Sequence, residues 1–345
     1  MLYIDKYIPR KIEDLIYNID VGKKLMDLAK KDTPHLIISG SGGSGKKTFA
    51  KLFIGFKYDK PINLKTQIYE LKRGSKSKNI EINVKHSKYH SQLNPSLSGV
   101  YDRFLIQEFI MDIIKTKPLG NIPYYTIVIE DAEKLTIDAQ QCLRRTLETH
   151  IDMCRFIFLT NSNTSLIEPL VSRCIKISIP TPTSDELLNL LSGICLKEQI
   201  TAKDDRLIEI IKNSNRNTRL TLNTLQLIFE TNKDLLIADN VIDFNLTSSK
   251  CLYITNIVEE LRVNNIDVVR NLLYDLLLHC IDPLDILKDI YYKIIDTYPI
   301  TKDSFFKLTE FLAYYENTYK QGSKPIYHLE GFCISIMDTQ TFSLS

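Results

Sequence analysis

The sequence lacks tryptophan, has only 12 glycines and 12 prolines among its 345 residues, and contains no long hydrophobic run. No apolar segment approaches the roughly 20 residues that a membrane-spanning helix requires. The first residues, Met1–Lys6, show no signal-peptide character. We therefore expect a soluble, intracellular protein that makes no contact with a membrane.

Cysteine pairs and a strong charge imbalance are also missing. The seven cysteines show no CxxC spacing, which argues against a zinc module or a disulfide framework and fits a reducing compartment. Lys and Arg total 44 against 42 Asp and Glu, a net charge of +2, so any nucleic-acid-binding surface must be local. The cysteines are Cys142, Cys154, Cys174, Cys195, Cys251, Cys280 and Cys333.

The most informative stretch is a glycine-rich loop at Gly40–Thr48, which reads Gly-Ser-Gly-Gly-Ser-Gly-Lys-Lys-Thr. An apolar run, His35–Ser39, precedes it and a helical pattern follows, which is the context of a phosphate-binding loop. Backbone N–H groups of such a loop converge on phosphate oxygens, and the helix N-terminus adds positive potential. Lys46 is expected to reach the β- and γ-phosphates. The nucleotide-binding residues we expect are Gly40, Ser41, Gly42, Gly43, Ser44, Gly45, Lys46, Lys47 and Thr48.

The loop departs from the usual pattern at one position. Gly-Lys is normally followed by Ser or Thr, whose hydroxyl ligates magnesium, but Lys47 occupies this place. Thr48 comes one residue later, where helix geometry turns its hydroxyl about 100° away. The loop therefore predicts nucleotide binding, with Mg²⁺ weak or absent.

A second motif begins after the apolar run Thr126–Ile129, where Glu130-Asp131 follows. In a P-loop ATPase the first carboxylate holds hydrated Mg²⁺ and the second orients the attacking water. AAA+ proteins usually show Asp and then Glu, so the order is inverted here. Misplacing a reacting group by 1 Å can cost about 100-fold in rate. We expect poor hydrolysis, with Glu130 a weak metal ligand and Asp131 the candidate catalytic carboxylate.

Three other polar positions each admit two interpretations. Asn161 follows the buried strand Arg155–Thr160 and either senses the γ-phosphate or caps a turn. Arg103, near the start of a helix, either contacts a DNA phosphate or is an ordinary surface arginine. The arm around Tyr7 and Pro9 either packs on the core or forms a wall for an adenine ring.

The chain length fits two or three domains. We predict an α/β P-loop domain with a parallel sheet at 1–180, a helical lid at 181–235 and a helical domain at 236–345. Pro180-Thr181-Pro182 marks the first boundary and the Asp/Asn-rich segment 232–247 the second. The expected elements include a helix at Lys11–Lys31, a hairpin pairing Ile68–Leu71 with Ile80–Val84 around the basic turn Lys72–Lys78, an edge strand at Ile175–Ile179, and helices at Asp102–Ile113, Ala139–His150, Asp185–Gln199, Asp204–Asn215, Thr218–Glu230 and across 252–340.

Several short motifs, in order along almost the whole chain, match one family. They are Tyr3–Pro9 (aromatic-x-x-Lys-Tyr-x-Pro), Pro34-His35-Leu36, Leu143–Glu148 (Leu-Arg-Arg-Thr-Leu-Glu), Ser172-Arg173-Cys174, Arg219 in the first turn of a helix, and the tail Gln321–Glu330. Together they resemble the small subunits of replication factor C, an AAA+ clamp loader. The Gly-Lys-Lys-Thr ending of the loop and the tail both point to one particular member of that family.

The resemblance implies a five-subunit complex that binds ATP or ADP between neighbours, opens the sliding clamp PCNA and loads it onto primer–template DNA. Arg173 would serve as an arginine finger for the next subunit's nucleotide, with Ser172, Cys174, Arg144 and Arg145 at the interface. Arg219 would reach the phosphates from the lid. Clamp contact would come from the outer face around residues 72–110, and Arg103 would contact DNA without sequence specificity. The heavy use of Asn, Ile and Lys and the few Gly suggest an AT-rich genome, compatible with a protist or a large DNA virus. We expect a nuclear protein in a eukaryote and a protein of a cytoplasmic replication factory in a virus.

Two other functions remain open. A stand-alone P-loop ATPase, such as a helicase loader or branch-migration motor, would need a Gly-Lys-Ser/Thr ending and an Asp-Glu pair, and the sequence has neither. A purely structural subunit would bind no nucleotide. Bound nucleotide in the purified protein would distinguish these two.

Overall fold

A computed structural model describes residues 2–58, 64–71, 80–95, 99, 101–115, 124–162, 164–200, 202–231, 249–322 and 324–338. The chain divides into two compact units, Met1–Asp239 and Asn240–Ser345. The three-domain division remains a prediction. The basic turn Lys72–Lys78 and the boundary segment 232–247 lie outside the described residues.

The first unit is built on a seven-stranded sheet in the order β2-β3-β4-β5-β6-β1-β7. Strands β4, β5, β6, β1 and β7 follow one another in the sheet and are parallel. The β2–β3 hairpin is antiparallel, and its strand β3 pairs with β4 in antiparallel fashion. The strands are β1 (His35–Ser39), β2 (Lys65–Leu71), β3 (Ile80–His86), β4 (His90–Leu93), β5 (Tyr125–Ile129), β6 (Cys154–Thr160) and β7 (Cys174–Ser178). The predicted α/β class, hairpin and edge strand are confirmed.

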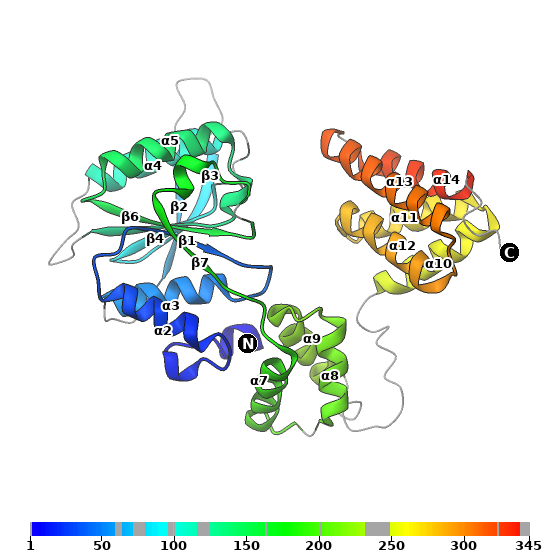
Figure 1. Cartoon of the computed structure of the whole chain (residues 1–345), viewed down its shortest axis with the longest axis horizontal. Coiled ribbons are helices and arrows are strands. Elements are labelled where there is room, and N and C mark those ends of the chain that lie inside the picture. Colours follow the sequence, from blue (N-terminus) through cyan, green and yellow to red (C-terminus); the bar gives the residue numbers. More distant parts are fainter. Residues whose placement is uncertain are drawn as a thin grey trace. The chain divides into compact units, whose positions relative to one another are not determined.

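Helices cover both faces of this sheet (Figure 1). Helices α4 and α5 pack on one face around Phe109, Leu143 and Phe156, while α2 and α3 pack on the other around Leu25 and Phe49. Because β1 is paired with β6 on one side and β7 on the other, and helices cover both faces, all five of its residues are buried. The unit's helices are α1 (Tyr3–Lys6), η1 (Ile12–Asp14), α2 (Ile19–Ala29), α3 (Lys46–Tyr58), α4 (Asp102–Lys115), η3 (Ala132–Lys134), α5 (Ile137–Thr149), α6 (Glu168–Val171), α7 (Ser184–Lys197), α8 (Asp204–Asn213) and α9 (Thr218–Thr231).

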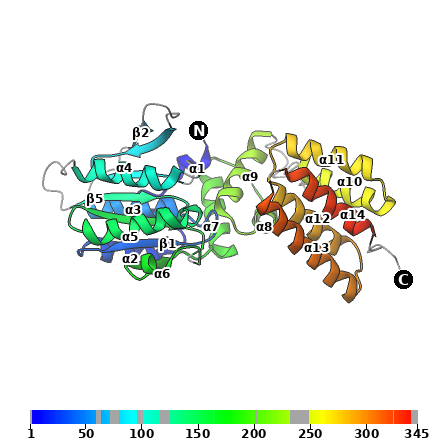
Figure 2. The same cartoon turned by 90° about the horizontal axis from the view of Figure 1, so that it is seen from above.

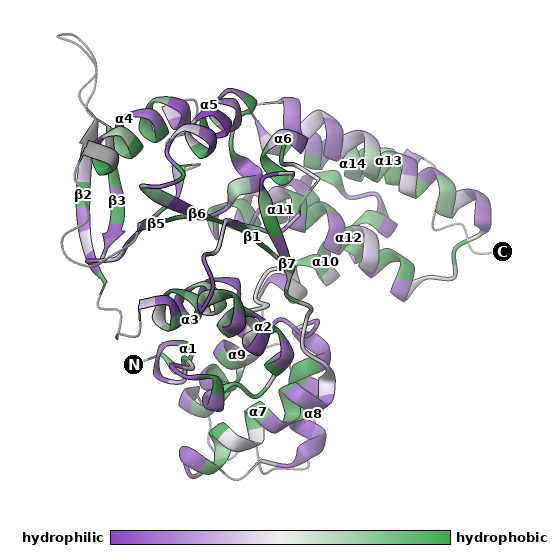
Figure 3. Ribbon diagram, turned by 60° about the vertical axis from the view of Figure 1, so that its left-hand side comes forward, coloured by the Kyte–Doolittle hydropathy of each residue, from purple (hydrophilic) through white to green (hydrophobic). Residues whose placement is uncertain are grey.

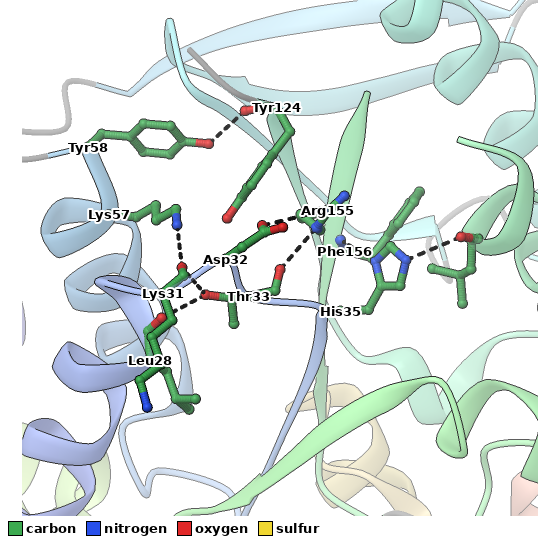
Figure 4. Close-up of polar contacts among 11 residues, drawn as sticks. Leu28, Lys31, Asp32, Thr33, His35, Lys57, Tyr58, Tyr124, Arg155 and Phe156 are labelled. Atoms are coloured by element: carbon green, nitrogen blue, oxygen red, sulfur yellow. Dashed lines mark hydrogen bonds and ion pairs between the residues drawn. The ribbon is translucent and has the colours of Figure 1, made fainter. Parts of the chain in front are cut away.

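The amino end of β1 is fixed by a polar network (Figure 4). Arg155 Nε donates to Thr33 O at 2.9 Å, and its guanidinium lies 4.5 Å from the centre of the Tyr124 ring. His35 accepts from the Phe156 N–H at 3.1 Å through Nδ1, and its Nε2 lies 3.3 Å from Leu147 O. Burial lowers the pKa of His35 to about 4. The neutral ring therefore links β1, β6 and α5 and fixes where the loop after β1 begins.

One helix prediction is wrong. The predicted helix at Lys11–Lys31 is interrupted, because only η1 and α2 form and Asn18 adopts a left-handed conformation (φ 55°) immediately before α2. Asparagine tolerates this conformation better than most residues do.

The described part of the second unit is a bundle formed by α10 to α14 (Figure 2), and its core includes Ile257, Leu273, Ile290 and Phe332. These helices carry hydrophobic and hydrophilic stretches on different faces (Figure 3). Proline begins α12, and α12 ends before Pro299, as expected for a residue that breaks helices. The bundle contains α10 (Ser249–Val263), α11 (Ile266–Leu278), α12 (Pro283–Thr297), α13 (Lys302–Gln321) and α14 (Pro325–Asp338). Within the described ranges, no helix is long and apolar enough to span a bilayer.

Candidate functional site

The glycine-rich loop connects β1 to α3 at the carboxyl edge of the parallel strands, where α/β proteins bind ligands. Gly43 and Gly45 have φ angles of 77° and 93°, a region that disfavours side chains. A Cβ on Gly43 would lie 1.8 Å from Asn217 Oδ1, so the loop also requires glycine there for space. The loop thus has the backbone of a phosphate-binding loop and closely approaches the residue before α9.

Lys46 connects this loop to the tip of β6. Its Nζ lies 2.7 Å from Gly40 O, 2.8 Å from Ser41 O and 2.7 Å from Asn161 Oδ1. The Asn161 amide in turn donates to Glu133 Oε1 at 2.6 Å. Burial lowers the pKa of Lys46, while the nearby carboxylates Glu133 and Asp131 act in the opposite direction. The structure therefore brings together the predicted phosphate-binding lysine and the predicted polar sensor.

Lys47 takes a different direction and pairs with Glu130. Its Nζ lies 2.5 Å from Glu130 Oε2, and the Gln92 amide donates to the other oxygen, Oε1. Glu130 is only 9% exposed. Mg²⁺ takes oxygen ligands in near-ideal octahedral geometry, but here an ammonium and an amide N–H engage the carboxylate that would serve it. The residues present do not fit a magnesium ion, and the described residues contain no group of three His, Cys, Asp or Glu side chains suited to a metal.

Asp131 is held separately from Glu130. It adopts a left-handed conformation (φ 47°) before η3, and its Oδ2 accepts from Asn94 Nδ2 at 2.8 Å. The two adjacent carboxylates therefore have different partners on β4 and just after it. Asp131 therefore accepts a hydrogen bond from the Asn94 amide, while Glu130, the candidate metal ligand, has other partners.

One side of the site comes from α9 (Thr218–Thr231). Arg219 lies in the first turn of α9, as predicted, and its N–H donates to Asn217 Oδ1 at 3.1 Å. The positive charge of its exposed guanidinium lowers the pKa of Lys46 after the stronger effects of burial and the carboxylates. Arg219 therefore faces the same region as the loop lysine.

The N-terminal arm packs on α9 and on the carboxyl end of α7. Tyr3 is 4% exposed, its N–H donates to Gln226 Oε1 at 2.8 Å on α9, and burial raises its pKa to about 12. The Tyr7 hydroxyl donates to Glu198, which directly follows α7 and also pairs with Lys6. The arm therefore packs through Tyr3 and Tyr7 on α9 and the end of α7, while an adenine wall at Tyr7 and Pro9 remains a prediction.

Arg173 lies far from the loop. It immediately precedes β7, whereas the loop follows β1, and these strands are parallel neighbours. A strand of five residues separates the two edges by about 15 Å. Arg173 Nη2 instead pairs with Glu148 on α5 at 2.5 Å, and its Nη1 donates to Pro169 O at 2.6 Å. Within this fold Arg173 therefore has no route to the chain's own loop.

The surroundings of Arg173 form an open polar cavity of about 550 Å³. Arg144 Nε lies 3.5 Å from the same Glu148 oxygen, and the Ser172 hydroxyl donates to Pro169 O at 3.3 Å. The Cys174 thiol has its pKa raised to about 12 by burial, so it is not a reactive nucleophile. The cavity is lined by Gln141, Arg144, Arg145, Glu148, Ile167 and Pro169.

Arg103 is placed where expected, at the start of α4. Its Nη1 lies 3.9 Å from Asp138 Oδ2, and both side chains are more than half exposed. The structure therefore leaves open both the DNA-contact and the surface-arginine interpretations.

Four site residues were not predicted. They are Gln92, Asn94, Glu148 and Asn217. Gln92 and Asn94 belong to or follow the short strand β4, whose place between β3 and β5 no local pattern reveals. Glu148 ends the family motif Leu143–Glu148, and Asn217 lies two residues before Arg219, so two of the four lie in or beside positions that the sequence had singled out.

Comparison with known proteins identifies the family. The chain is 33% identical over 350 residues to probable replication factor C subunit 3 of Dictyostelium discoideum, covering 98% of both chains. It is 31% identical to replication factor C subunit 3 of Homo sapiens, covering 97% of this chain and 95% of that protein. The chain belongs to the replication factor C small subunits. Replication factor C subunit 5 of Saccharomyces cerevisiae is 30% identical over 97% of this chain and 98% of its own length.

Other matches agree with this replication factor C membership. The family described as replication factor C subunit 3, C-terminal domain, matches residues 251–343. A DNA polymerase III gamma subunit-related protein of Thermotoga maritima has a TM-score of 0.54 and 13% identity, covering 92% of this chain and 99% of that one. The RuvB branch-migration motor of the same organism has a TM-score of 0.50 at 14% identity, covering 74% of this chain and 78% of that one. These structures share the fold alone.

Proposed function

We propose that this chain is one of five subunits of a clamp loader that uses ATP to open the sliding clamp PCNA and place it on primer–template DNA in replication and repair. The observation that carries the proposal is relatedness along 98% of the chain to a replication factor C subunit 3, including the helical second unit. Its partners are then four paralogous subunits, the clamp and DNA. The eukaryotic relatives favour a nuclear location, with a cytoplasmic factory the expectation for a viral member.

The loop Gly40–Thr48 is proposed to bind ATP or ADP. Its positive-φ glycines support this, as do the convergence of Lys46 and Asn161 and the position of Arg219. Tyr7 and Pro9 are proposed to lie near the adenine, a role that the family resemblance supports. Hydrolysis in this site is proposed to be slow, because Lys47 replaces the metal-binding hydroxyl and Asp131 is bonded to Asn94.

Arg173 is proposed to act on the nucleotide of a neighbouring subunit. Its position at the opposite edge of the sheet from its own loop supports action in trans. An arginine finger is worth about 10³–10⁵ in rate to the site that receives it. Arg144, Arg145, Ser172 and Cys174 surround it and would form the contact with the neighbour.

DNA binding is proposed to be phosphate-based and independent of sequence, with Arg103 one candidate contact. The proposed clamp-binding face around residues 72–110 lies partly outside the described residues. The described part includes the first turns of α4, on which Phe104 is exposed.

Steady-state ATP hydrolysis by reconstituted five-subunit complexes tests these assignments. We expect Arg173→Ala to lower DNA-stimulated turnover, because the neighbour loses its finger, and Lys46→Ala to change turnover little. Arg206→Ala, which removes an arginine paired with Glu209 on α8, is the control and should match the wild type. Loss of turnover in Lys46→Ala with no change in Arg173→Ala would reverse the two roles. Failure to copurify with the clamp and four paralogues would refute the proposal as a whole.

A further inference from the structure

The ion pair between Lys47 and Glu130 also places a positive charge beside the nucleotide-binding loop. Lys47 is the second residue of α3 and follows the loop lysine directly, at the position from which P-loop proteins usually hold the metal. Its ammonium lies 2.5 Å from the carboxylate that would otherwise face that metal. A positive charge is therefore present at the place in the sequence and in the fold where a cation is normally recruited.

The carboxylates around the loop are each engaged by nitrogen donors. Glu130 accepts from Lys47 and Gln92, Asp131 from Asn94, and Glu133 from Asn161. A magnesium ion would have to displace several of these donors and would meet the Lys47 ammonium at close range. Like charges this close are strongly unfavourable at a carboxylate that is only 9% exposed.

We propose that Lys47 is a built-in counter-ion, so that this chain binds a nucleoside diphosphate or triphosphate without magnesium. The inference rests on the proposed nucleotide binding at Gly40–Thr48. The positive charge that phosphate oxygens require comes from Lys46, Lys47 and Arg219, together with the loop N–H groups. Glu130 holds Lys47 in position, and Gln92 holds Glu130.

Fluorescence titration of the full chain with mant-ADP, in excess MgCl₂ and in excess EDTA, tests the proposal. For the wild type we expect dissociation constants within about twofold of each other in the two buffers. Lys47→Ser restores the usual hydroxyl and frees Glu130, so its binding should weaken by about tenfold or more in EDTA. Lys47→Arg, which keeps the charge, should remain insensitive to EDTA. Lys24→Ser, the same substitution at an exposed lysine on α2, should behave as the wild type.

Electron paramagnetic resonance with Mn²⁺ gives a second readout. In the presence of ADP the Lys47→Ser chain should immobilise one Mn²⁺, and the wild type should add none beyond the Mn²⁺ that free ADP binds. A wild type that loses about tenfold in affinity in EDTA would overturn the inference while leaving nucleotide binding intact. EDTA insensitivity in Lys47→Ser would overturn the assignment to Lys47. No mant-ADP binding by any variant in either buffer would instead refute the nucleotide-binding proposal itself.

Discussion

Gly43 shows how strongly single residues constrain the loop. Its φ of 77° is unfavourable for a residue with a side chain, and a Cβ at this position would lie only 1.8 Å from Asn217 Oδ1. We predict that Gly43→Ala costs about 1–3 kcal/mol of stability and weakens mant-ADP binding. Urea unfolding followed by circular dichroism measures the first effect.

Gly42 is a matched control for this change, because a Cβ there meets no atom within 4 Å. Gly42→Ala should therefore change the free energy of unfolding by less than about 0.5 kcal/mol. Equal stability of the two alanine variants would contradict the prediction.

Two buried histidines make stability depend on pH. Burial lowers the pKa of both His35 and His90 to about 4, from the ordinary value of 6.5. The folded state therefore favours the neutral rings, so stability is full above pH 6.5 and is lost as the pH falls toward 4. Each histidine contributes a slope of about 1.4 kcal/mol per pH unit in this window.

The variant His90→Gln isolates one of these contributions. His90 Nε2 has no hydrogen-bond partner among the described residues, so removing the ring sacrifices no bond at that atom. We predict that the slope of the free energy of unfolding between pH 4.5 and 6 falls by up to about 1.4 kcal/mol per pH unit. An unchanged slope in His90→Gln would contradict the prediction.

At the scale of elements, α7 begins with a capping box. The Thr183 hydroxyl accepts from Glu186 N at 3.3 Å, and Glu186 Oε2 accepts from Thr183 N at 2.8 Å. We predict that Thr183→Ala costs about 1 kcal/mol in this helix and speeds amide exchange in its first turn by about fivefold. Hydrogen exchange measured by mass spectrometry should show the effect in α7 and not in α8. Uniform exchange across both helices would contradict it.

Elements with a local signal could be predicted from the sequence, and those fixed by tertiary context could not. The bounds of β1 and the first turn of α9 follow from an apolar run and from a break before a helical pattern. Strand β4 is different, because His90, Ser91 and Gln92 are polar yet buried. They become a strand because β3 and β5 flank them, which no local pattern contains. For the same reason, the sequence did not reveal that Gln92 on β4 is the second hydrogen-bond partner of Glu130.

The candidate site divides in the same way. Local patterns pointed to Lys46 and the acidic pair, because glycine loops and strand ends have local signatures, whereas the role of Arg219 came from the family resemblance. Which side chains these residues contact depends on the order of strands in the sheet and on side-chain rotamers. The ion pair of Lys47 with Glu130 and that of Arg173 with Glu148 therefore appear only in three dimensions.

At the scale of the whole molecule, the helical unit should fold alone. It has its own core, and its buried side chains include Leu276, Ile290 and Phe332. We predict that a recombinant fragment of residues 240–345 unfolds cooperatively by circular dichroism. Phe332→Ala should destabilise it by about 3–5 kcal/mol, whereas alanine at the exposed Tyr327 should cost less than about 0.5 kcal/mol. A non-cooperative transition in the unmutated fragment would contradict this.

The ion pair between Arg173 and Glu148 links this chain's assembly to the ionic composition of its surroundings. If Arg173 enters a neighbour's nucleotide site, its guanidinium leaves the Glu148 carboxylate and pairs with a phosphate of the neighbour's nucleotide. Arg173 and Glu148 are one-third and nearly one-half exposed, so the pair they leave contributes at most about 1 kcal/mol. Dissolved salt weakens such an exposed pair more than it weakens a phosphate contact enclosed between subunits. Moderate ionic strength would therefore release the arginine in the free chain and lower the electrostatic barrier to its capture by the neighbour.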